Sequence, residues 1–587
     1  MVNLTINDTP VSVPAGTTII AAAQAIGINI PSLCYLKDLN EISACRVCSV
    51  EVEGEAKLVP SCSNVVREGM KIHTNSPRAR QARKINVELI LSQHDCRCAI
   101  CSRSGNCKLQ KISNDLGIKG TLYADMQPKA PIITDWTTTF PLFRNPRKCL
   151  KCMRCVQVCE KVQSLGVWDV SGTGSRTTID VSHNRVIKQA DCVLCGQCIT
   201  HCPVEALRER DDTDGVFAAL AAKQKVTVIQ VAPAVRTALG ATLQTGETPV
   251  SPETIVAALK QIGFDYVFDT SFAADLTIME ESTELLQRLN AGELQEFPMF
   301  TSCCPAWVRF MKSQYPQYVK YLSSSKSPQQ MFGAVTKTWF AQSIGVNPAD
   351  IYSVSVMPCL AKKAECALPT MARNGVADVD ASITTREIIR MIRSENILPQ
   401  DLTAVPFDSP LGTATGAGVI FGATGGVMEA ALRSAYYFVT GQAPKDELFQ
   451  AVRGEKAWKE ATYSLGQATV RCAVVSGLAN ARKLMEALIA KEVQYDFVEV
   501  MSCPGGCVGG GGQPISLQDE ELATKRSETL YALDKKDALR NSYDNPVIQE
   551  LYGQFLEKPG SEAAEHLLHT DHEGWSMPLA VKLQKKK

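Results

Sequence analysis

The first residues alternate between apolar and polar side chains. In VNLTINDTPVSV (2–13) the pair Asn7-Asp8 interrupts the alternation, which predicts a hairpin around that pair. The next stretch, TTIIAAAQAIG (17–27), is expected to be helical. From about residue 222 onward, apolar strand-like runs alternate with amphipathic helical segments, which is typical of α/β architecture.

Three of the later apolar runs end just before cysteines. FPMFT precedes Cys303-Cys304, YSVSVMP precedes Cys359, and DFVEVMS precedes Cys503. Ligands of open α/β sheets bind beyond the carboxyl ends of the strands. We therefore expect these cysteines to meet in one crevice. A single cysteine at such a place would be read as apolar packing, but three at equivalent places predict a site.

Length and charge narrow the class of protein. A chain of 587 residues predicts several domains, and 45% hydrophobic with 21% charged residues is typical of a soluble globular protein. Lys plus Arg equals Asp plus Glu, 61 each, which argues against nucleic-acid and anionic-membrane partners. Without a signal peptide or a membrane-spanning run, the expected location is cytoplasmic. The basic end, KLQKKK, is expected to be a solvated, disordered tail.

Cysteine is the informative residue. There are 23, and 16 of them lie within the first 202 residues. A secreted disulfide framework is the alternative, but a long chain without a signal sequence favours reduced thiolates. The tight CxxC spacings also suit metal or cluster ligation.

The first cysteine group consists of Cys34, Cys45, Cys48 and Cys62, spaced C-x10-C-x2-C-x13-C. Four thiolates can hold a 2Fe-2S cluster, although the first gap is longer than in plant-type ferredoxins. The order of strands, helix and cysteine loop resembles the β-grasp ferredoxin domain. A four-cysteine zinc site is the rival interpretation.

The second group consists of His94, Cys98, Cys101 and Cys107, which suit zinc or a 4Fe-4S cluster; Cys96 is interpreted as a bystander. Placed directly after the first group, the arrangement resembles the amino-terminal region of FeFe hydrogenases and of the large iron–sulfur subunit of respiratory complex I.

The third group repeats the two-cluster bacterial ferredoxin motif, in which the fourth cysteine of each run serves the other cluster. The predicted ligand sets are Cys149, Cys152, Cys155 and Cys202 for one 4Fe-4S cluster, and Cys192, Cys195, Cys198 and Cys159 for the other.

Three further motifs resemble the signatures of the FeFe-hydrogenase active-site domain, in the order of that family: TSCCPAW (301–307), MPCLAKK (357–363) and EVMSCPGGCVGGGGQP (499–514). The resemblance implies an H-cluster, which is a 4Fe-4S cluster joined to a two-iron subsite bearing carbon monoxide, cyanide and an azadithiolate. The implied cluster ligands are Cys304, Cys359, Cys503 and Cys507, the last bridging to the subsite. The implied pocket residues are Lys362 near an iron-bound cyanide, and Ala232, Pro233, Gln329, Met357 and Met501.

The resemblance also implies a proton path. The first cysteine of the TSCCP pair relays protons in the family, and Glu281, Glu284 and Arg288 share one face of an expected helix at i, i+3 and i+7. Without the motifs, a solvated helix face with an ion pair would be the interpretation. With them, the implied relay runs through Cys303, Glu281, Ser323, Glu284 and Arg288.

The predicted fold is therefore a multidomain α/β protein with a two-lobed active-site domain. The expected domains are 1–78 (2Fe-2S, β-grasp), 79–138 (a 4Fe-4S cluster held by one histidine and three cysteines), 139–210 (two-cluster ferredoxin-like), 222–570 (hydrogenase active site) and 571–587 (tail). The predicted cofactors are one 2Fe-2S cluster, three accessory 4Fe-4S clusters and the H-cluster.

The predicted activity is the reversible reaction 2H⁺ + 2e⁻ ⇌ H₂. An electron-carrying subunit of complex I type has no reason to carry the three later motifs. An assembly factor would not be expected to retain Cys303, the relay acids and Lys362 together, and no signalling domain suggests hydrogen sensing. The glycines at 416, 418 and 422 resemble a dinucleotide loop only faintly, with one residue too many and no preceding strand.

The sequence gives less specific evidence about the electron partners. A monomer coupled to ferredoxin is one possibility. Partner subunits that carry flavin, NAD(H) and iron–sulfur clusters in an electron-bifurcating complex are the favoured one, because FAADLTIMEE (272–281) resembles the bifurcating subgroup. The H-cluster also implies dedicated maturation enzymes. For Cys366 and Cys472 we expect packing roles.

Overall fold

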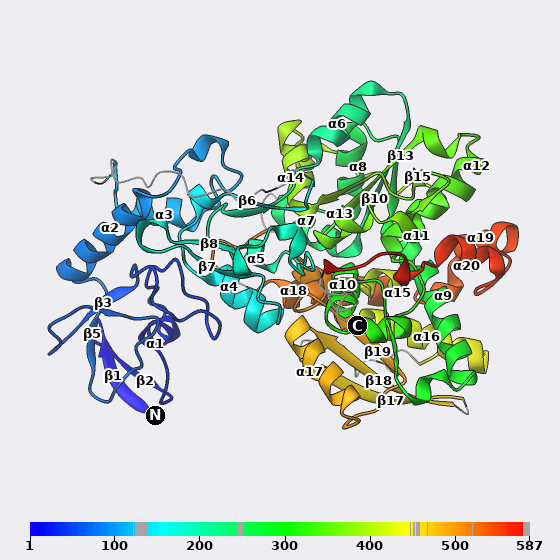
Figure 1. The fold of residues 1–587 in the computed structure, drawn as a ribbon. Coiled ribbons are helices and arrows are strands. Elements are labelled where there is room, and N and C mark those ends of the chain that lie inside the picture. Colours follow the sequence, from blue (N-terminus) through cyan, green and yellow to red (C-terminus); the bar gives the residue numbers. More distant parts are fainter. Residues whose placement is uncertain are drawn as a thin grey trace.

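The structure is a computed structural model of the chain. It describes residues 1–120, 123, 136, 139–243, 250–445, 448–449, 452–453, 458–466, 468–518 and 521–578. The amino-terminal domain lies at one end of the molecule, and the cysteine-rich segments connect it to a larger carboxyl-terminal part (Figure 1). The final residues, 579–587, which include the expected disordered tail, lie outside the described residues.

The amino-terminal domain is a small mixed sheet covered by a helix. The predicted hairpin is confirmed, because Ile6 pairs with Thr9 and the residues between them, Asn7 and Asp8, both have positive φ angles (48° and 64°). The predicted helix is also confirmed as α1 (Ile19–Ala25), which begins after the Thr18 cap. The sheet has the order β2-β1-β5-β3-β4. Its strands are β1 (Val2–Ile6), β2 (Thr9–Val13), β3 (Ser49–Val52), β4 (Val59–Pro60) and β5 (Lys71–His73).

The connecting region consists of short elements around cysteine loops. Its helices are α2 (Pro77–Leu91), α3 (Lys108–Asp115), α4 (Arg154–Gln157) and α5 (Gln197–Thr200). Its paired strands are β6 (Leu142–Arg144) with β9 (Leu207–Glu209), and β7 (Trp168–Ser171) with β8 (Thr178–Val181). The β6–β9 ladder brings the two ends of the third cysteine group together.

The carboxyl-terminal part contains two four-stranded sheets, as expected of a two-lobed α/β domain. The first has the order β11-β10-β13-β16, and all its strands are parallel. The second has the order β12-β19-β18-β17, with only the edge strand β17 antiparallel. The strands are β10 (Val226–Val231), β11 (Tyr266–Asp269), β13 (Ile351–Met357), β16 (Ala381–Thr384), β12 (Met299–Phe300), β17 (Trp458–Leu465), β18 (Ala468–Ser476) and β19 (Phe497–Met501).

Helices cover both sheets (Figure 1). Those used below are α7 (Pro233–Leu243), α9 (Thr270–Asn290), α10 (Pro305–Gln314), α11 (Pro328–Val335), α13 (Ala361–Glu365), α14 (Thr385–Ser394), α15 (Gly416–Ile420), α16 (Gly426–Thr440), α18 (Ala523–Lys536), α19 (Pro546–Leu551) and α20 (Glu562–Leu568). The expected helix around Glu281 is part of the 21-residue α9, whose first half is buried.

The glycine-rich stretch that resembled a dinucleotide loop forms the buried helix α15. A Cβ atom at Gly418 would lie 2.4 Å from the Ser271 carbonyl oxygen of α9, and one at Gly416 would lie 2.3 Å from the Asp534 side chain of α18. These glycines therefore allow three helices to pack closely. In the part of the chain that the structure describes, no helix is long and apolar enough to cross a membrane.

Candidate active site

The three cysteine-terminated strands meet at one cavity. Strands β12 and β19 are neighbours in the second sheet, whereas β13 belongs to the first, so the cavity lies between the lobes. About 790 Å³ of space free of protein atoms lies in and in front of it, including open solvent at its mouth. The four cysteines expected to hold the active-site cluster all line it: Cys304, Cys359, Cys503 and Cys507.

The chemistry and shape of this cavity fit an iron–sulfur group. Four thiols suit a four-iron cubane. The backbone also comes unusually close, since a Cβ atom at Gly510 would lie 2.2 Å from the Pro358 carbonyl oxygen and one at Gly506 would lie 2.8 Å from the Thr424 nitrogen. Among the described residues, no three His, Cys, Asp or Glu side chains are close enough together to hold a single metal ion. The four thiols instead surround a space large enough for a bulky group.

One charged side chain, Lys362, lies in the cavity wall. Its Nζ donates to the Cys303 carbonyl oxygen at 3.2 Å and forms an ion pair with Glu365 at 3.0 Å. Burial by itself would lower the Lys362 pKa, but the Glu365 carboxylate more than compensates and the pKa is raised. Lys362 therefore stays cationic in the cavity, where an anionic ligand such as cyanide would be stabilised.

The other pocket residues expected from the sequence also line the cavity. They are Ala232, Pro233, Gln329, Met357 and Met501. Gln329 is held firmly, because its Oε1 accepts from Ser355 at 2.7 Å and its Nε2 donates to Glu365 at 3.0 Å. The wall is otherwise mostly apolar, which keeps water away from a bound group.

Cys303 lies in the cavity wall, close enough to Glu281 of α9 to be influenced by its charge. Burial, and then the nearby Glu281 carboxylate, raise the pKa of its thiol well above the ordinary value. Glu281 is fully buried, accepts from the Ser302 N–H at 3.4 Å and contacts Ser323. Burial and the Glu284 charge raise the pKa of Glu281 to about 8. A carboxyl group with such a pKa can exchange protons near neutral pH.

The second half of the expected relay continues to the surface. Ser323 Oγ donates to Glu284 Oε2 at 2.7 Å, and Arg288 donates to Glu284 Oε1 at 2.6 Å. Arg288 is the most exposed of the three, at 18% of its side chain. The solvated helix face that these charges would otherwise suggest is thus not observed at Glu281 and Glu284, which are both buried. Hydrogen bonds thus link Arg288, Glu284 and Ser323, Ser323 contacts Glu281, and Glu281 acts electrostatically on Cys303.

In the amino-terminal domain, the four cysteines of the first group come together. The thiols of Cys34 and Cys62 contact each other, Cys45 contacts Cys34, and Cys48 contacts Cys62. All four side chains are buried. This arrangement fits a cluster held by four thiolates.

The third group separates into the two sets expected from the repeated motif. A cavity of about 430 Å³ is lined by Cys149, Cys152, Cys155 and Cys202. Cys195 interacts electrostatically with Cys192, Cys198 and Cys159. The fourth cysteine of each run therefore faces the other run.

The second group is less compact than the others. Cys98 interacts with Cys107, whereas His94 and Cys101 both lie near Lys148. Among the described residues, the buried His94 Nδ1 has no hydrogen-bond partner, which fits a role as a ligand of a metal or cluster. Cys96 is exposed and contacts the His94 carbonyl oxygen.

Comparison with known proteins decides the family. Residues 225–511 match the family described as "Iron only hydrogenase large subunit, C-terminal domain". NADP-reducing hydrogenase subunit HndD of Solidesulfovibrio fructosivorans is 44% identical and aligns over 97% of this chain and 99% of that protein. Iron hydrogenase 1 of Clostridium pasteurianum is 38% identical over 97% and 99%. The chain belongs to the iron-only (FeFe) hydrogenases.

The likeness extends to solved structures and to the amino-terminal domains. The structure of apo FeFe-hydrogenase HydA1 from Chlamydomonas reinhardtii is 38% identical with a TM-score of 0.56, covering 63% of this chain and 99% of that one. The other matching families are a 2Fe-2S cluster binding domain (1–77), the NADH-ubiquinone oxidoreductase-G iron-sulfur binding region (83–121), a 4Fe-4S dicluster domain (148–206) and the iron hydrogenase small subunit (520–575). This FeFe hydrogenase therefore carries its iron–sulfur domains ahead of the catalytic domain, as the motifs predicted.

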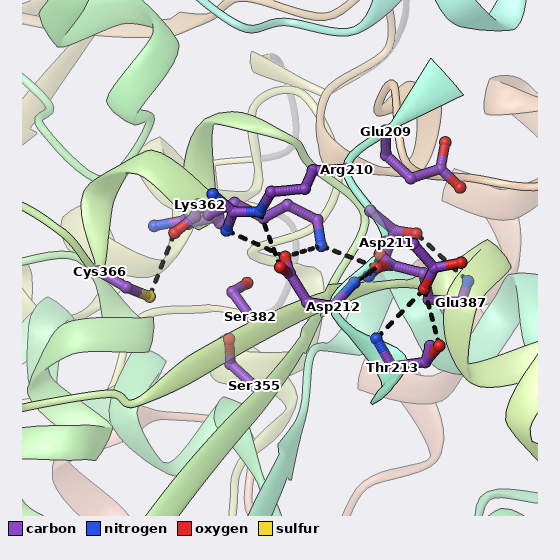
Figure 2. A network of polar contacts seen from close by, with 12 residues as sticks. Glu209, Arg210, Asp211, Asp212, Thr213, Ser355, Lys362, Cys366, Ser382 and Glu387 are labelled. Atoms are coloured by element: carbon purple, nitrogen blue, oxygen red, sulfur yellow. Dashed lines mark hydrogen bonds and ion pairs between the residues drawn. The ribbon is translucent and has the colours of Figure 1, made fainter. Parts of the chain in front are cut away.

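Polar contacts beside the cavity join the hydrogenase domain to the segment that follows the dicluster region. Lys363, next to Lys362, donates to Asp212 at 2.6 Å and to Glu387 of α14 at 2.9 Å. Figure 2 shows Asp212 and Glu387 on the two sides of this contact, and the Cys366 thiol pointing toward the backbone of Lys362. These contacts hold α13, the helix that carries Lys362, in place.

Several residues of the hydrogenase site were missed by sequence reasoning. Glu365 pairs with Lys362, and the i, i+3 spacing of this pair could have indicated it. Ser502 Oγ accepts from the Cys304 thiol at 3.3 Å, and nothing in the sequence signals this contact beyond the place of Ser502 beside Cys503. Cys472 packs in an apolar cluster as expected. Cys366 does not simply pack, because its sulfur interacts with Gln329 at 3.3 Å and with the Lys362 carbonyl oxygen at 3.2 Å.

Proposed function

We propose that this FeFe hydrogenase interconverts protons, electrons and dihydrogen at an H-cluster held in the cavity between the two lobes. The observation that carries the proposal is the convergence of four cysteines from three distant strand ends on a cavity that also contains Lys362 and Cys303. When bound, the cluster would supply the redox centre at which two protons and two electrons combine.

The ligand roles combine the family motifs with positions in the cavity. Cys304, Cys359, Cys503 and Cys507 line it and would hold the cubane, and by the resemblance to the family Cys507 would also be the protein's link to the two-iron subsite. With a single protein bond, that subsite must be fixed by its surroundings. Lys362 supplies the positive charge, and the two methionines, the glutamine and the Ala232-Pro233 pair shape the wall.

Protons move between the cavity and the surface through side chains. Cys303 exchanges a proton with Glu281, which passes it through the Ser323 hydroxyl to Glu284 and on to the solvent near Arg288. The hydrogen bonds from Ser323 to Glu284 and from Arg288 to Glu284 support the outer half of this path. The electrostatic interaction between Cys303 and Glu281 supports the inner half.

Electrons reach the cavity through one 2Fe-2S and three 4Fe-4S accessory clusters. The ligands are the four amino-terminal cysteines, the His94 group, and the two interleaved sets of the dicluster region. The position of Cys195 beside Cys503 supports direct transfer from the last accessory cluster to the active-site cubane.

We further propose that the chain works in a complex with partner subunits that bind flavin and NAD(H), and exchanges electrons with ferredoxin in a bifurcating reaction. The full-length similarity to a subunit named as NADP-reducing supports this proposal, as does the region similar to an NADH-ubiquinone oxidoreductase subunit. A stand-alone, ferredoxin-dependent enzyme is the alternative. Purification from the native host decides between them, because a chain that elutes alone and is fully active with ferredoxin would contradict the complex.

Turnover by protein matured with its dedicated maturation enzymes tests the catalytic proposal. Purified anaerobically, it should evolve dihydrogen with a reduced one-electron carrier and consume it with an oxidised one. A Cys507→Ser variant is the control, because it should keep the accessory clusters and lose turnover. Fully loaded wild-type protein that is inactive in both directions would contradict the proposal.

A further inference from the structure

Glu284 of the relay has a second serine neighbour. Ser324 donates its backbone N–H to Glu284 Oε1 at 3.1 Å, and its hydroxyl lies 3.2 Å from the same oxygen. Arg288 also binds this oxygen, at 2.6 Å. Ser324 and Arg288 therefore both contact the same carboxylate oxygen of Glu284. Of the two, only Arg288 belongs to the relay described above.

The Ser324 hydroxyl lies against a histidine from the far end of the chain. Ser324 Oγ and His569 Nδ1 are 2.8 Å apart, although 245 residues separate them in sequence. Backbone contacts fix the approach, because Thr570 N–H donates to the Ser324 carbonyl oxygen at 2.8 Å and Ser325 forms a β-bridge with His569. The His569 side chain is 13% exposed, so this branch reaches solvent.

The other ring nitrogen of His569 is held by a buried carboxylate. Nε2 lies 3.0 Å from Glu280 Oε2, and Glu280 also accepts from the Tyr552 hydroxyl and from the Gly560 N–H at 3.0 Å. Glu280 is buried and adjoins Glu281 on α9. A carboxylate that binds one nitrogen of a histidine fixes its tautomer, so Nδ1 is left to accept from Ser324.

We propose that Ser324 and His569, with His569 oriented by Glu280, form a second exit for protons from Glu284, parallel to Arg288. For an outgoing proton, the O–H bond of the Glu284 carboxyl breaks as an O–H bond forms at Ser324. The original Ser324 hydroxyl proton passes to His569 Nδ1. The result is a Glu284 carboxylate and a His569 imidazolium facing the Glu280 carboxylate, and the imidazolium then releases a proton to water. Uptake follows the same steps in reverse.

This inference rests on the proposed relay through Glu281 and Glu284. The groups that face the branch are Glu280 and Glu284 of α9, and Tyr552, whose hydroxyl binds Glu280. A second histidine, His572, is nearby. Its Nε2 lies 2.8 Å from the Ser323 carbonyl oxygen, so this nitrogen is not available to accept a proton from Glu284. The rival role for His569 is structural, as one of the contacts that join the segment after α20 to residues 324–326.

The test compares two single variants with their combination in the matured enzyme. Parallel exits predict that Arg288→Ala and His569→Ala each lower turnover only slightly, because the other exit remains. The double variant should lose about 100-fold, far more than the product of the single effects. Added imidazole should restore part of the turnover of the double variant, which a structural role for His569 would not allow.

Control variants separate the possible failures. His566→Ala removes an exposed histidine of α20, the helix that ends just before His569, and should change nothing. Ser324→Ala combined with Arg288→Ala should reproduce the double variant while His569 keeps its packing. If Glu281→Gln leaves turnover intact, the relay itself fails. If Glu281→Gln abolishes turnover but the double variant shows only the product of the single effects, without imidazole rescue, the second exit alone is overturned.

Discussion

Cys503 Sγ lies 3.9 Å from the backbone carbonyl oxygen of Cys195. One residue belongs to the active-site cavity and the other to the dicluster region, 308 positions earlier in the chain. Gln197 Nε2 donates to the Gly509 carbonyl oxygen at 2.9 Å, and Gln163 Nε2 donates to the Ser502 carbonyl oxygen at 3.1 Å. The dicluster region and the catalytic domain are therefore in direct contact at the point where the proposed route requires an electron to cross.

The close contact between the two regions depends on Gly511. We therefore predict that adding a single methyl group at this position disturbs it. A Cβ atom at Gly511 would lie 2.3 Å from the Cys195 carbonyl oxygen and 2.4 Å from Gly196 Cα. Gly511→Ala should push the two segments apart and slow electron transfer between the clusters. Turnover with an external electron carrier should fall more than hydrogen–deuterium exchange at the active site, which needs no external electrons. Gly215→Ala, in open space, is the matched control.

Replacing Glu281 tests the relay. The Glu281→Gln side chain keeps the size of the residue but cannot exchange a proton, so turnover should fall by about 100-fold or more. Iron content and the spectra of the accessory clusters should not change. Glu293→Gln, at an exposed position after α9, should behave like the wild type. Nearly normal turnover by Glu281→Gln would rule out the relay.

The pH dependence should reveal the same carboxyl group. Because burial and Glu284 raise the pKa of Glu281 to about 8, the proton-donating form is present below that pH and is lost above it. Dihydrogen evolution at constant driving force should decline as the pH rises through about 8, whereas dihydrogen oxidation, which needs the deprotonated form, should increase. Protein-film electrochemistry can measure both. An evolution rate that is flat across this range would contradict the assignment of Glu281.

The ion pair between Lys362 and Glu365 should stabilise the part of the cavity wall that residues 359–366 form. Glu365→Ala leaves the Lys362 charge buried without its partner, which costs about 3 kcal/mol or more. The segment 359–366 should then exchange amide hydrogens faster. Glu365→Gln, which can still form hydrogen bonds, should have a smaller effect, and the exposed Glu550→Ala should have none. Unchanged exchange in Glu365→Ala would show that Lys362 is held by its other contacts.

The parts of the site that could be predicted from the sequence are those with a local signal. Cys304, Cys359 and Cys503 each follow a recognisable strand, and the acids of α9 share a helical face. The strands could be predicted, but not that β13 belongs to one sheet and β12 and β19 to the other. That division depends on pairing between segments that lie far apart in the chain.

The parts that could not be predicted depend on contacts between distant segments. His569 reaches Glu280 across 289 positions, and nothing in the sequence around His569 indicates such a partner. Cys366 was expected to pack because its polar neighbours, Gln329 and the Lys362 backbone, become neighbours only in the fold. Local patterns identify side chains that can bind metals or transfer protons, whereas tertiary packing decides which of them lie close together.

The most direct measurement is an infrared spectrum of anaerobically purified, matured protein in the region of metal-bound carbon monoxide and cyanide. An H-cluster in the cavity of Cys304, Cys359, Cys503 and Cys507 predicts sharp bands there, and Cys507→Ser should lack them. A blank spectrum from wild-type protein that carries all its cubanes, despite active maturation enzymes, would contradict the assignment and leave an electron carrier.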